Sequence, residues 1–345
     1  MYNKKSKIEL EKDLGNENFE RITCSFYRYF SITNPNKLRD IIYKNLEDLN
    51  ILGRVYIAFE GINAQVSVPD YQMESFKQYI QSIDGLSNLQ FKYAVEEGRS
   101  FIKLKILVRD EIVAYKIPEN SYDMTKVGTH LKPIDFHKSI KKDGSVVVDM
   151  RNYYESEVGR FKSAVIPDAH YSKELLPTVA KLLEKEKNNK VHLYCTGGIR
   201  CEKASSYLIK KGFKEVYQLE GGVIQYAHDI KNSNLESEFI GKNFVFDDRM
   251  GERVTNDILS LCHQCEEPSD YHNNCNNYAC HLLFIQCEKC SDKFKGCCSK
   301  DCMDFASLDA DIQKKLRKDK NKKVSSAKLS TKFRPKLYKL FNYWK

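Results

Sequence analysis

The first third of the chain shows two alternating hydrophobic patterns. In some segments every second residue is apolar, as in half-buried strands, and in others apolar residues recur at spacings of three and four, as in amphipathic helices. Strands are predicted over residues 21–30, 53–59 and 64–68 and twice more within 90–108, and helices over 35–49 and 71–83. This β-α-β-β-α-β order over residues 19–115 predicts a ferredoxin-like (acylphosphatase-like) α+β domain.

The pattern changes after residue 115. Residues 116–137 contain Pro118, Gly128 and Pro133 and are predicted to be a connector. From 138 to 235, short apolar runs alternate with helical patterns, which predicts an α/β domain with a central parallel sheet covered on both faces. Its strands are expected at 146–148, 191–194 and 216–219, and its helices at 175–186 and 202–211. In such sheets, functional sites lie beyond the carboxyl ends of the strands.

The C-terminal part differs in composition from the rest. Residues 236–310 have few apolar positions and many cysteines, and residues 311–345 form a basic tail. The tail carries eleven Lys and two Arg against two Asp, a net +11, so the remainder of this +9 chain is about −2. Aromatic residues lie among these charges, which suits phosphate contacts and base stacking, although a solvated tail without a partner is the alternative. They are Phe333, Tyr338, Phe341, Tyr343 and Trp344.

The composition is that of a globular protein. Hydrophobic residues make up 41% of the 345 and charged residues 30%. No apolar run approaches the roughly 18 residues of a membrane-spanning helix, and the basic N-terminus leads into acidic residues instead of the apolar core of a signal peptide. We therefore expect a cytoplasmic protein without a membrane partner. Its twelve cysteines are then expected to be thiols or metal ligands rather than disulfides.

The most informative motif follows the apolar run 191–194. It reads Cys195, Thr196, Gly197, Gly198, Ile199, Arg200, and it leads into a helical pattern. A Gly-Gly turn between a strand and a helix points backbone N–H groups and a helix N-terminus at the sulfur, which favours the thiolate. Such surroundings lower a thiol pKa from ~8.5 to ~3.5–7.5. Cys195 is therefore predicted to be catalytic, with a strand-ending structural cysteine as the alternative.

The spacing of Cys195 and Arg200 distinguishes two classes of loop. Tyrosine-phosphatase-type loops are Cys-x5-Arg, whereas this loop is Cys-x4-Arg, and the shorter ring suits a smaller group such as sulfur bound to sulfur. This favours a rhodanese-like module. Residues 149–167 and 217–222 resemble two sequence signatures of that module. Asp149 and Arg151 either form an ion pair that supports the strand end, or Arg151 helps to bind an anionic substrate. Arg200 is expected to hold the loop and to face an anion.

Nine cysteines between residues 262 and 302 form a second constellation. The pairs Cys262-x2-Cys265 and Cys287-x2-Cys290 have the spacing that wraps a turn around tetrahedral zinc. A segment this poor in apolar residues would gain much of its folding free energy from a metal. We expect one or two zinc sites, with iron–sulfur ligation and metal-free thiols or redox disulfides as alternatives. The further candidate ligands are Cys275, Cys280, Cys297, Cys298 and Cys302, with His263, His272 and His281.

The run 195–205 resembles one rhodanese-related family, the tRNA uridine hydroxylases. Residues 59–64, 262–265 and 280–287 match the same family in order, so the resemblance covers about residues 19–302. It implies hydroxylation of the wobble uridine of tRNA to 5-hydroxyuridine, with molecular oxygen as co-substrate and the anticodon region as partner. The expected parts are a ferredoxin-like domain (19–115), a rhodanese-like catalytic domain (138–235), a Cys-rich segment (236–310) and the basic tail (311–345).

The residues themselves leave the chemistry open. Cys195 could add to C6 of a uracil ring and make C5 electron-rich, which is nucleophilic catalysis, or it could carry a persulfide. Cys201 could resolve a sulfenic acid or persulfide on Cys195, or be a buried helix cysteine. No Gly-x-Gly-x-x-Gly occurs, so neither a flavin nor a nicotinamide site is expected. A sulfurtransferase and a non-catalytic RNA-binding module are the rival functions.

Overall fold

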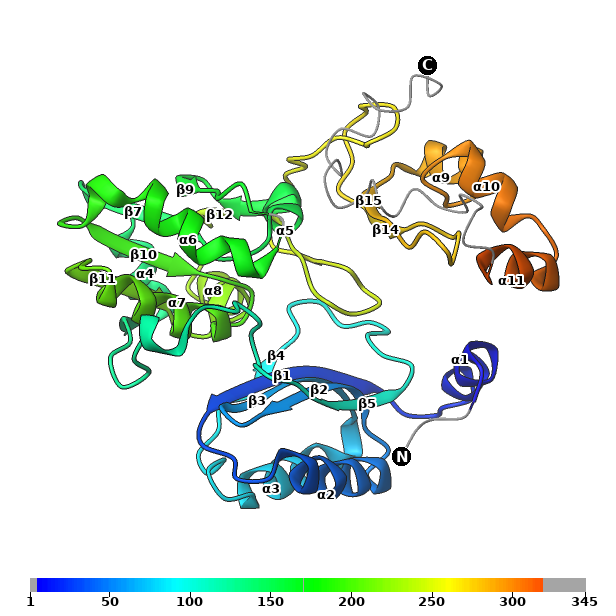
Figure 1. The fold of residues 1–345 in the computed structure, drawn as a ribbon, viewed down its shortest axis with the longest axis horizontal. Coiled ribbons are helices and arrows are strands. Elements are labelled where there is room, and N and C mark those ends of the chain that lie inside the picture. The colour runs from blue at the N-terminus through cyan, green and yellow to red at the C-terminus, as the bar shows by residue number, and fades with distance from the viewer. Residues whose placement is uncertain (1–4, 170, 319–345) are drawn as a thin grey trace. The chain divides into compact units, whose positions relative to one another are not determined.

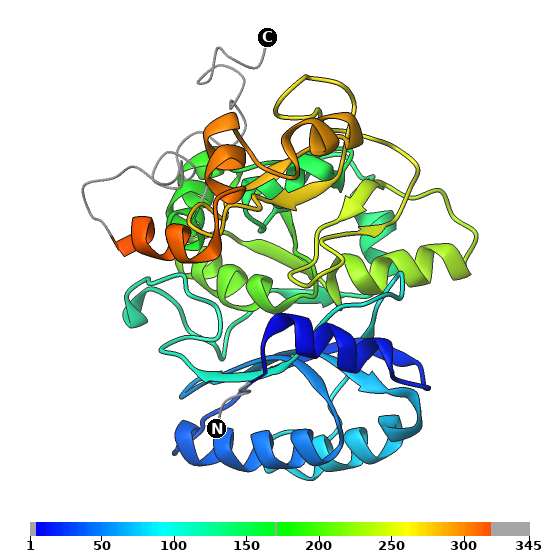
Figure 2. The same cartoon turned by 90° about the vertical axis from the view of Figure 1, so that its right-hand side faces the viewer.

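The computed structural model describes residues 5–169 and 171–318, which form two compact units (Figures 1 and 2). The first unit comprises the residues up to 156 together with 160–239 and 243–254. The second comprises 157–159, 240–242 and the residues from 255 onward. In the described residues, no helix has both the length and the apolar character needed to cross a membrane.

The N-terminal part of the first unit is a five-stranded sheet with two long helices. Its strand order is β4-β1-β3-β2-β5, and only the β2–β5 pair is parallel. The first four strands have the order and directions of a ferredoxin-like sheet, so this prediction is confirmed, and β5 extends the edge of β2. The elements are α1 (Lys7–Gly15), β1 (Arg21–Tyr29), α2 (Pro35–Asp48), β2 (Leu52–Ala58), β3 (Gly61–Pro69), a 3-10 turn (Asp70–Gln72), α3 (Met73–Ser82), β4 (Lys92–Tyr93) and β5 (Leu104–Val108).

The two faces of this sheet differ in polarity. On the central strand β3, Ile62, Ala64 and Val66 are buried in the core with α2 and α3, which lie on one side of the sheet (Figure 1). The alternating residues Asn63 and Gln65 face the other way and are only half-buried. The sheet therefore presents a polar face opposite its helices.

The second part of this unit is built on a parallel sheet. Its order is β6-β11-β10-β7-β9, and all four pairs of neighbouring strands are parallel. Successive residues of a strand enter different cores: Val148 packs with α6 and α7, whereas Val147 packs with α4 and α8. Both faces are covered, which confirms the predicted α/β class. The elements are β6 (Thr129–Leu131), α4 (Pro133–Ser139), β7 (Ser145–Asp149), α5 (Tyr153–Val158), β8 (Gly159–Phe161), β9 (Ala164–Val165), α6 (Ser172–Leu182), β10 (Lys190–Tyr194), α7 (Ile199–Lys210), β11 (Glu215–Leu219) and α8 (Gly222–Asn232), with 3-10 turns at Glu119–Ser121 and Glu184–Glu186.

The second unit has little regular structure. Strands β14 and β15 pair antiparallel, and seven of the ten buried residues in its core cluster are cysteines. Its other elements are β14 (His272–Asn274), β15 (Leu283–Ile285), α9 (Glu288–Phe294), α10 (Lys300–Ala306) and α11 (Ala310–Lys318). Strand β12 (Phe239–Asn243) has its middle residues in this unit, and β13 (Glu252–Arg253) belongs to the first unit. Helix α11 contains the first residues of the basic tail, 311–318. The prediction for the rest of the tail, residues 319–345, lies outside the described residues.

Candidate active site

Cys195 lies where the central strand β10 ends and the chain turns into α7. The turn is made possible by Gly198, which caps α7 with a left-handed φ of 98°. A Cβ on Gly198 would also lie 2.8 Å from the Tyr27 hydroxyl. The position at the carboxyl end of a parallel strand is the one expected for a site in this class of sheet.

Cys195 is buried, yet its surroundings favour the thiolate. The backbone N–H of Gly198 donates to Sγ at 3.1 Å. Burial alone would raise the pKa of the Cys195 thiol, but a hydrogen bond from Cys201 and the charge of Arg200 outweigh burial. With the backbone N–H groups of the loop they lower the pKa of Cys195 to about 6, whereas burial and the same hydrogen bond raise the pKa of Cys201. At neutral pH, Cys195 is thus the ionised member of this pair.

The turn that begins α8 packs against the backbone of the Cys195 loop and donates hydrogen bonds to it. Gly222 has a φ of 65°, and a Cβ there would lie 2.5 Å from the Thr196 carbonyl oxygen and 2.6 Å from that of Cys195. This close approach lets Val223 N–H donate to the Cys195 carbonyl at 3.0 Å and Ile224 N–H to that of Thr196 at 3.2 Å. The glycine pair at 221–222 therefore supports the loop that begins at Cys195.

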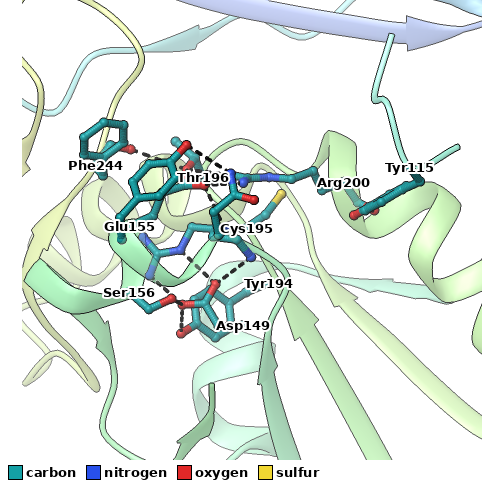
Figure 3. Close-up of polar contacts among 12 residues, drawn as sticks. Tyr115, Asp149, Glu155, Ser156, Tyr194, Cys195, Thr196, Arg200 and Phe244 are labelled. Carbon is teal, nitrogen blue, oxygen red and sulfur yellow. Dashed lines mark hydrogen bonds and ion pairs between the residues drawn. The ribbon is translucent and has the colours of Figure 1, made fainter. Parts of the chain in front are cut away.

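Arg200 does not point freely at an anion. Its guanidinium forms a two-point ion pair with Glu155, with Nη1–Oε1 at 2.6 Å and Nη2–Oε2 at 2.8 Å, and Nη2 also donates to Thr196 Oγ1 at 3.1 Å (Figure 3). The Glu155 side chain has no exposed surface. Glu155 is a site residue that the sequence reasoning missed. The signal was its position within residues 149–167, which resemble a rhodanese signature, but its partner Arg200 is 45 residues away in the sequence.

Asp149 and Arg151 form a completely buried ion pair. Arg151 donates to Asp149 through Nε at 2.9 Å and Nη2 at 2.7 Å, and the hydroxyls of Tyr194 and Ser156 donate to Oδ2 at 2.7 and 2.8 Å (Figure 3). Burial opposes ionisation of Asp149, but Arg151 and these hydroxyls hold its pKa below the ordinary value. Arg151 does not line the cavity that contains Cys195, so the geometry favours the ion-pair alternative.

The first turns of α7 contact the N-terminal domain through Glu202 and Lys203. Glu202 accepts a hydrogen bond from the Tyr27 hydroxyl at 3.0 Å. Lys203, whose side chain has no exposed surface, forms ion pairs with Glu60 at 2.8 Å and Glu111 at 3.0 Å. These contacts join residues 195–205 to the Phe59–Ala64 segment, two stretches that the sequence analysis singled out separately.

Between the polar face of the N-terminal sheet and the catalytic loop lies a cavity of about 340 Å³. Cys195 lines one wall, and Tyr27, Asn63 and Lys92 line the other. The Lys92 ammonium lies 4.4 Å from the centre of the Tyr27 ring. Burial lowers the pKa of Lys92 to about 8, although the nearby thiolate of Cys195 opposes this. The volume is within the usual range for small-molecule sites.

The C-terminal cysteines form two sets of four in the described residues. In each set all four sulfurs lie within 4.8 Å of one another, so both sets can bind a metal ion. Eight of the nine predicted ligands are brought together, whereas Cys297 belongs to neither set, and neither do His263, His272 and His281. The first set is Cys262, Cys265, Cys287 and Cys290, and the second is Cys275, Cys280, Cys298 and Cys302.

Comparisons with known proteins match the three parts of the chain. Residues 21–112 match the UPF0176 acylphosphatase like domain, 132–229 the rhodanese-like domain and 240–303 the rhodanase C-terminal domain. A tRNA uridine(34) hydroxylase of Leptospira interrogans is 44% identical over an alignment of 346 residues, 99% of this chain and 93% of that protein. One of Photorhabdus laumondii is 44% identical over 339 residues, 98% of this chain and 96% of that protein.

Proposed function

Because the chain belongs to the family of the tRNA uridine(34) hydroxylases, we propose that it hydroxylates the wobble uridine of tRNA, at position 34, to 5-hydroxyuridine with molecular oxygen as co-substrate. The observation that carries this proposal is a cysteine with a pKa of about 6 at the wall of a nucleobase-sized cavity. Full-length relatives named as hydroxylases do not favour a sulfurtransferase or a non-catalytic RNA-binding module.

The chemistry assigned to Cys195 is addition to the uracil ring. The Sγ lone pair forms a bond to C6, and the C5–C6 π pair moves onto C5 and O4, which makes C5 electron-rich and ready for oxidation. A thiolate is required for this step because the thiol is a weak nucleophile. One oxygen atom of O2 is then transferred to C5, and the other is reduced to water by a two-electron donor from outside the chain. Loss of the C5 proton with departure of the sulfur from C6 restores both the aromatic ring and the thiolate.

The other residues of the loop are assigned supporting roles. Arg200, paired with Glu155, stabilises the thiolate by its charge and ties Thr196 into the loop. Cys201 is assigned two roles: its thiol lowers the pKa of Cys195 and so stabilises the thiolate, and it reacts with an oxidised Cys195. Asp149 and Arg151 hold the end of β7 beside β10, where Asp149 pairs in register with Tyr194, the residue before Cys195.

The test is nucleoside analysis of tRNA from cells that lack the protein. Loss of 5-hydroxyuridine and its derivatives, restored by the full chain, supports the proposal. Incubation of the purified protein with an anticodon stem-loop RNA under oxygen-18 gas should place the label in the new hydroxyl group. If thiolated nucleosides are lost and hydroxylated ones are kept, the protein is a sulfurtransferase. If neither changes, the tRNA assignment is wrong.

We also propose that each four-cysteine set binds one zinc ion. Four Zn–S bonds of about 2.3 Å in a tetrahedron separate the sulfurs by about 3.8 Å. The Sγ–Sγ distance is 3.5 Å for Cys265–Cys287 and 3.7 Å for both Cys280–Cys298 and Cys298–Cys302. In an iron–sulfur cluster the cysteines bind different iron atoms, so most of their sulfurs lie farther apart than the sulfurs around one zinc ion.

Metal analysis checks the zinc proposal. The full chain purified without chelator is expected to contain two zinc ions per molecule. Cys298→Ser should lower this content because it removes one ligand of the second set, whereas the matched control Cys297→Ser should keep two. A strong chelator should unfold the second unit, since cysteines supply most of its core and metal binding there is folding free energy. Iron in place of zinc, or no metal, would contradict the proposal.

The basic tail is proposed to contribute to tRNA affinity. Because neutralised phosphates release counterions, deletion of residues 311–345, with net charge +11, should weaken tRNA binding and flatten its dependence on salt. Binding of labelled tRNA at several salt concentrations measures this. A chain whose eleven tail lysines are replaced by glutamine keeps the aromatic residues and separates charge from stacking. An unchanged salt slope in both chains would contradict the role of the tail.

A further inference from the structure

Two amide side chains of β3 lie on the cavity wall that contains no catalytic residue. Asn63 and Gln65 are neighbours on the polar face of the N-terminal sheet. Asn63 pairs in register with Tyr27 on β1 and with Tyr56 on β2, and both tyrosines also line the cavity. Asn63 thus lies between two aromatic residues, and Gln65 lies between Ser25 and Arg54 in the same two strands.

The two amides bind each other and leave defined groups for a ligand. Gln65 Nε2 donates to Asn63 Oδ1 at 3.0 Å. Within the described residues, neither side chain makes another hydrogen bond that satisfies Asn63 Nδ2 or Gln65 Oε1. The pair therefore offers one donor next to one acceptor, and the opposite orientation of both amides would offer the same combination. Half-buried polar groups of this kind favour a ligand that pairs with both.

The imide edge of uracil has the matching combination. Its O4 accepts a hydrogen bond and its adjacent N3–H donates one, and single-stranded RNA loops are typically recognised through such edges. We propose that the Asn63–Gln65 amide pair binds the O4 and N3–H groups of the target uracil and selects uridine over cytidine. This inference rests on the proposed function, since it names the residues that recognise the base on which Cys195 acts.

The geometry of the base suits the two walls. In the pyrimidine ring C6 lies directly opposite N3, so a base whose N3 edge faces β3 presents C6 toward the other side. Cys195 lines that side. A base in a single-stranded loop can be turned into a pocket at low cost because it has little stacking or pairing to lose. Because a nucleophile adds to C6 from the face of the ring, Cys195 attacks from above or below the plane of a base whose N3 edge is bound by β3.

The test uses Asn63→Asp in the full chain. This nearly isosteric change keeps an acceptor for Gln65 but replaces the donor facing O4 by an acceptor, which suits the amino group of cytosine. With an anticodon stem-loop carrying uridine 34, kcat/KM should fall by about 10- to 100-fold, the equivalent of one buried hydrogen bond. Competition by the same RNA carrying cytidine 34 should become at least tenfold stronger relative to the uridine RNA.

Controls separate this role from a structural one. Gln90→Ala removes an exposed amide beside β4, outside the cavity, and should leave both rate and discrimination unchanged. Asn63→Ala should lower the rate without favouring cytidine, and its unfolding should match that of the wild type. If Asn63→Asp keeps wild-type discrimination while the wild type hydroxylates uridine 34, this inference is wrong. If the wild type itself hydroxylates no uridine, the proposed function is wrong instead.

Discussion

Cys195→Ser is expected to reduce formation of 5-hydroxyuridine by more than about a thousandfold, the scale seen when the nucleophile of covalent catalysis is removed. A serine hydroxyl in the same place stays protonated, because the contacts that bring the thiol pKa to about 6 act on a group that is far less acidic. The fold should be kept, since Cys195 and serine differ by one atom and Gly198 N–H still has an acceptor. The measurement is nucleoside mass spectrometry after reaction with a stem-loop RNA.

The control is another buried cysteine. Burial raises the pKa of Cys24 to about 12, so this side chain remains a thiol at neutral pH. Cys24→Ala is therefore expected to keep most of the activity. Hydroxylation by Cys195→Ser at a wild-type rate would contradict the assignment of the nucleophile, and equal loss in both variants would indicate damage to the fold.

The same cysteine predicts a pH dependence. Because the active form is the deprotonated one, the rate should rise about tenfold per pH unit below the pKa of Cys195, which is about 6, and level off above it. The Arg200→Lys variant loses the two-point pairing with Glu155 and should shift this rise to higher pH. A rate that is independent of pH between 5 and 7 would contradict thiolate attack.

Asp149→Asn is expected to destabilise the first unit by about 3–5 kcal/mol, because it leaves the guanidinium of Arg151 charged and fully buried without its carboxylate. The asparagine keeps the size of the side chain, so the loss reports charge and not volume. Denaturant unfolding followed by circular dichroism measures it, since the single tryptophan, Trp344, lies in the tail. Removing both charges in Asp149→Asn with Arg151→Met should recover part of the loss.

The pH dependence of this effect has a definite sign. The pKa of Asp149 is lowered by folding, so its stabilising contribution is present above the ordinary pKa of 3.8 and is lost as pH falls through the lower value of the folded state. The difference between wild type and Asp149→Asn should thus be full at neutral pH and shrink only in acid. The exposed pair Lys187–Glu184 is the control, because Glu184→Gln should cost less than about 1 kcal/mol. Equal losses at both pairs would contradict the argument.

Local signals in the sequence predicted most of the fold. The continuous apolar run at 146–148 predicted a strand covered on both faces, and the Gly-Gly turn after Cys195 predicted the position of this cysteine at the end of β10. Both predictions depend only on neighbouring residues. The partners of the loop were not predictable in this way. Glu155 meets Arg200 across 45 residues, and Asn63 reaches the cavity only because the whole N-terminal sheet packs there.

The metal ligands show the same limit. The spacing of Cys262-x2-Cys265 and Cys287-x2-Cys290 identified two pairs, but it did not say that they share one set. The second set takes Cys275 and Cys280 from between these pairs, which only the folded chain reveals. Cys297 was a candidate only as one of nine cysteines in the segment, and the folded chain places it in neither set although it is next to Cys298 in the sequence.

The buried Lys203 has a consequence for the modularity of this protein. Its two carboxylate partners, Glu60 and Glu111, come from outside the rhodanese-like stretch, whereas the lysine lies one turn after the catalytic loop in the same helix. If residues 132–229 were grafted onto another scaffold, this helix would carry an ammonium group without its two carboxylate partners. The rhodanese-like domain therefore depends on the N-terminal residues for its packing, and the two cannot be exchanged independently.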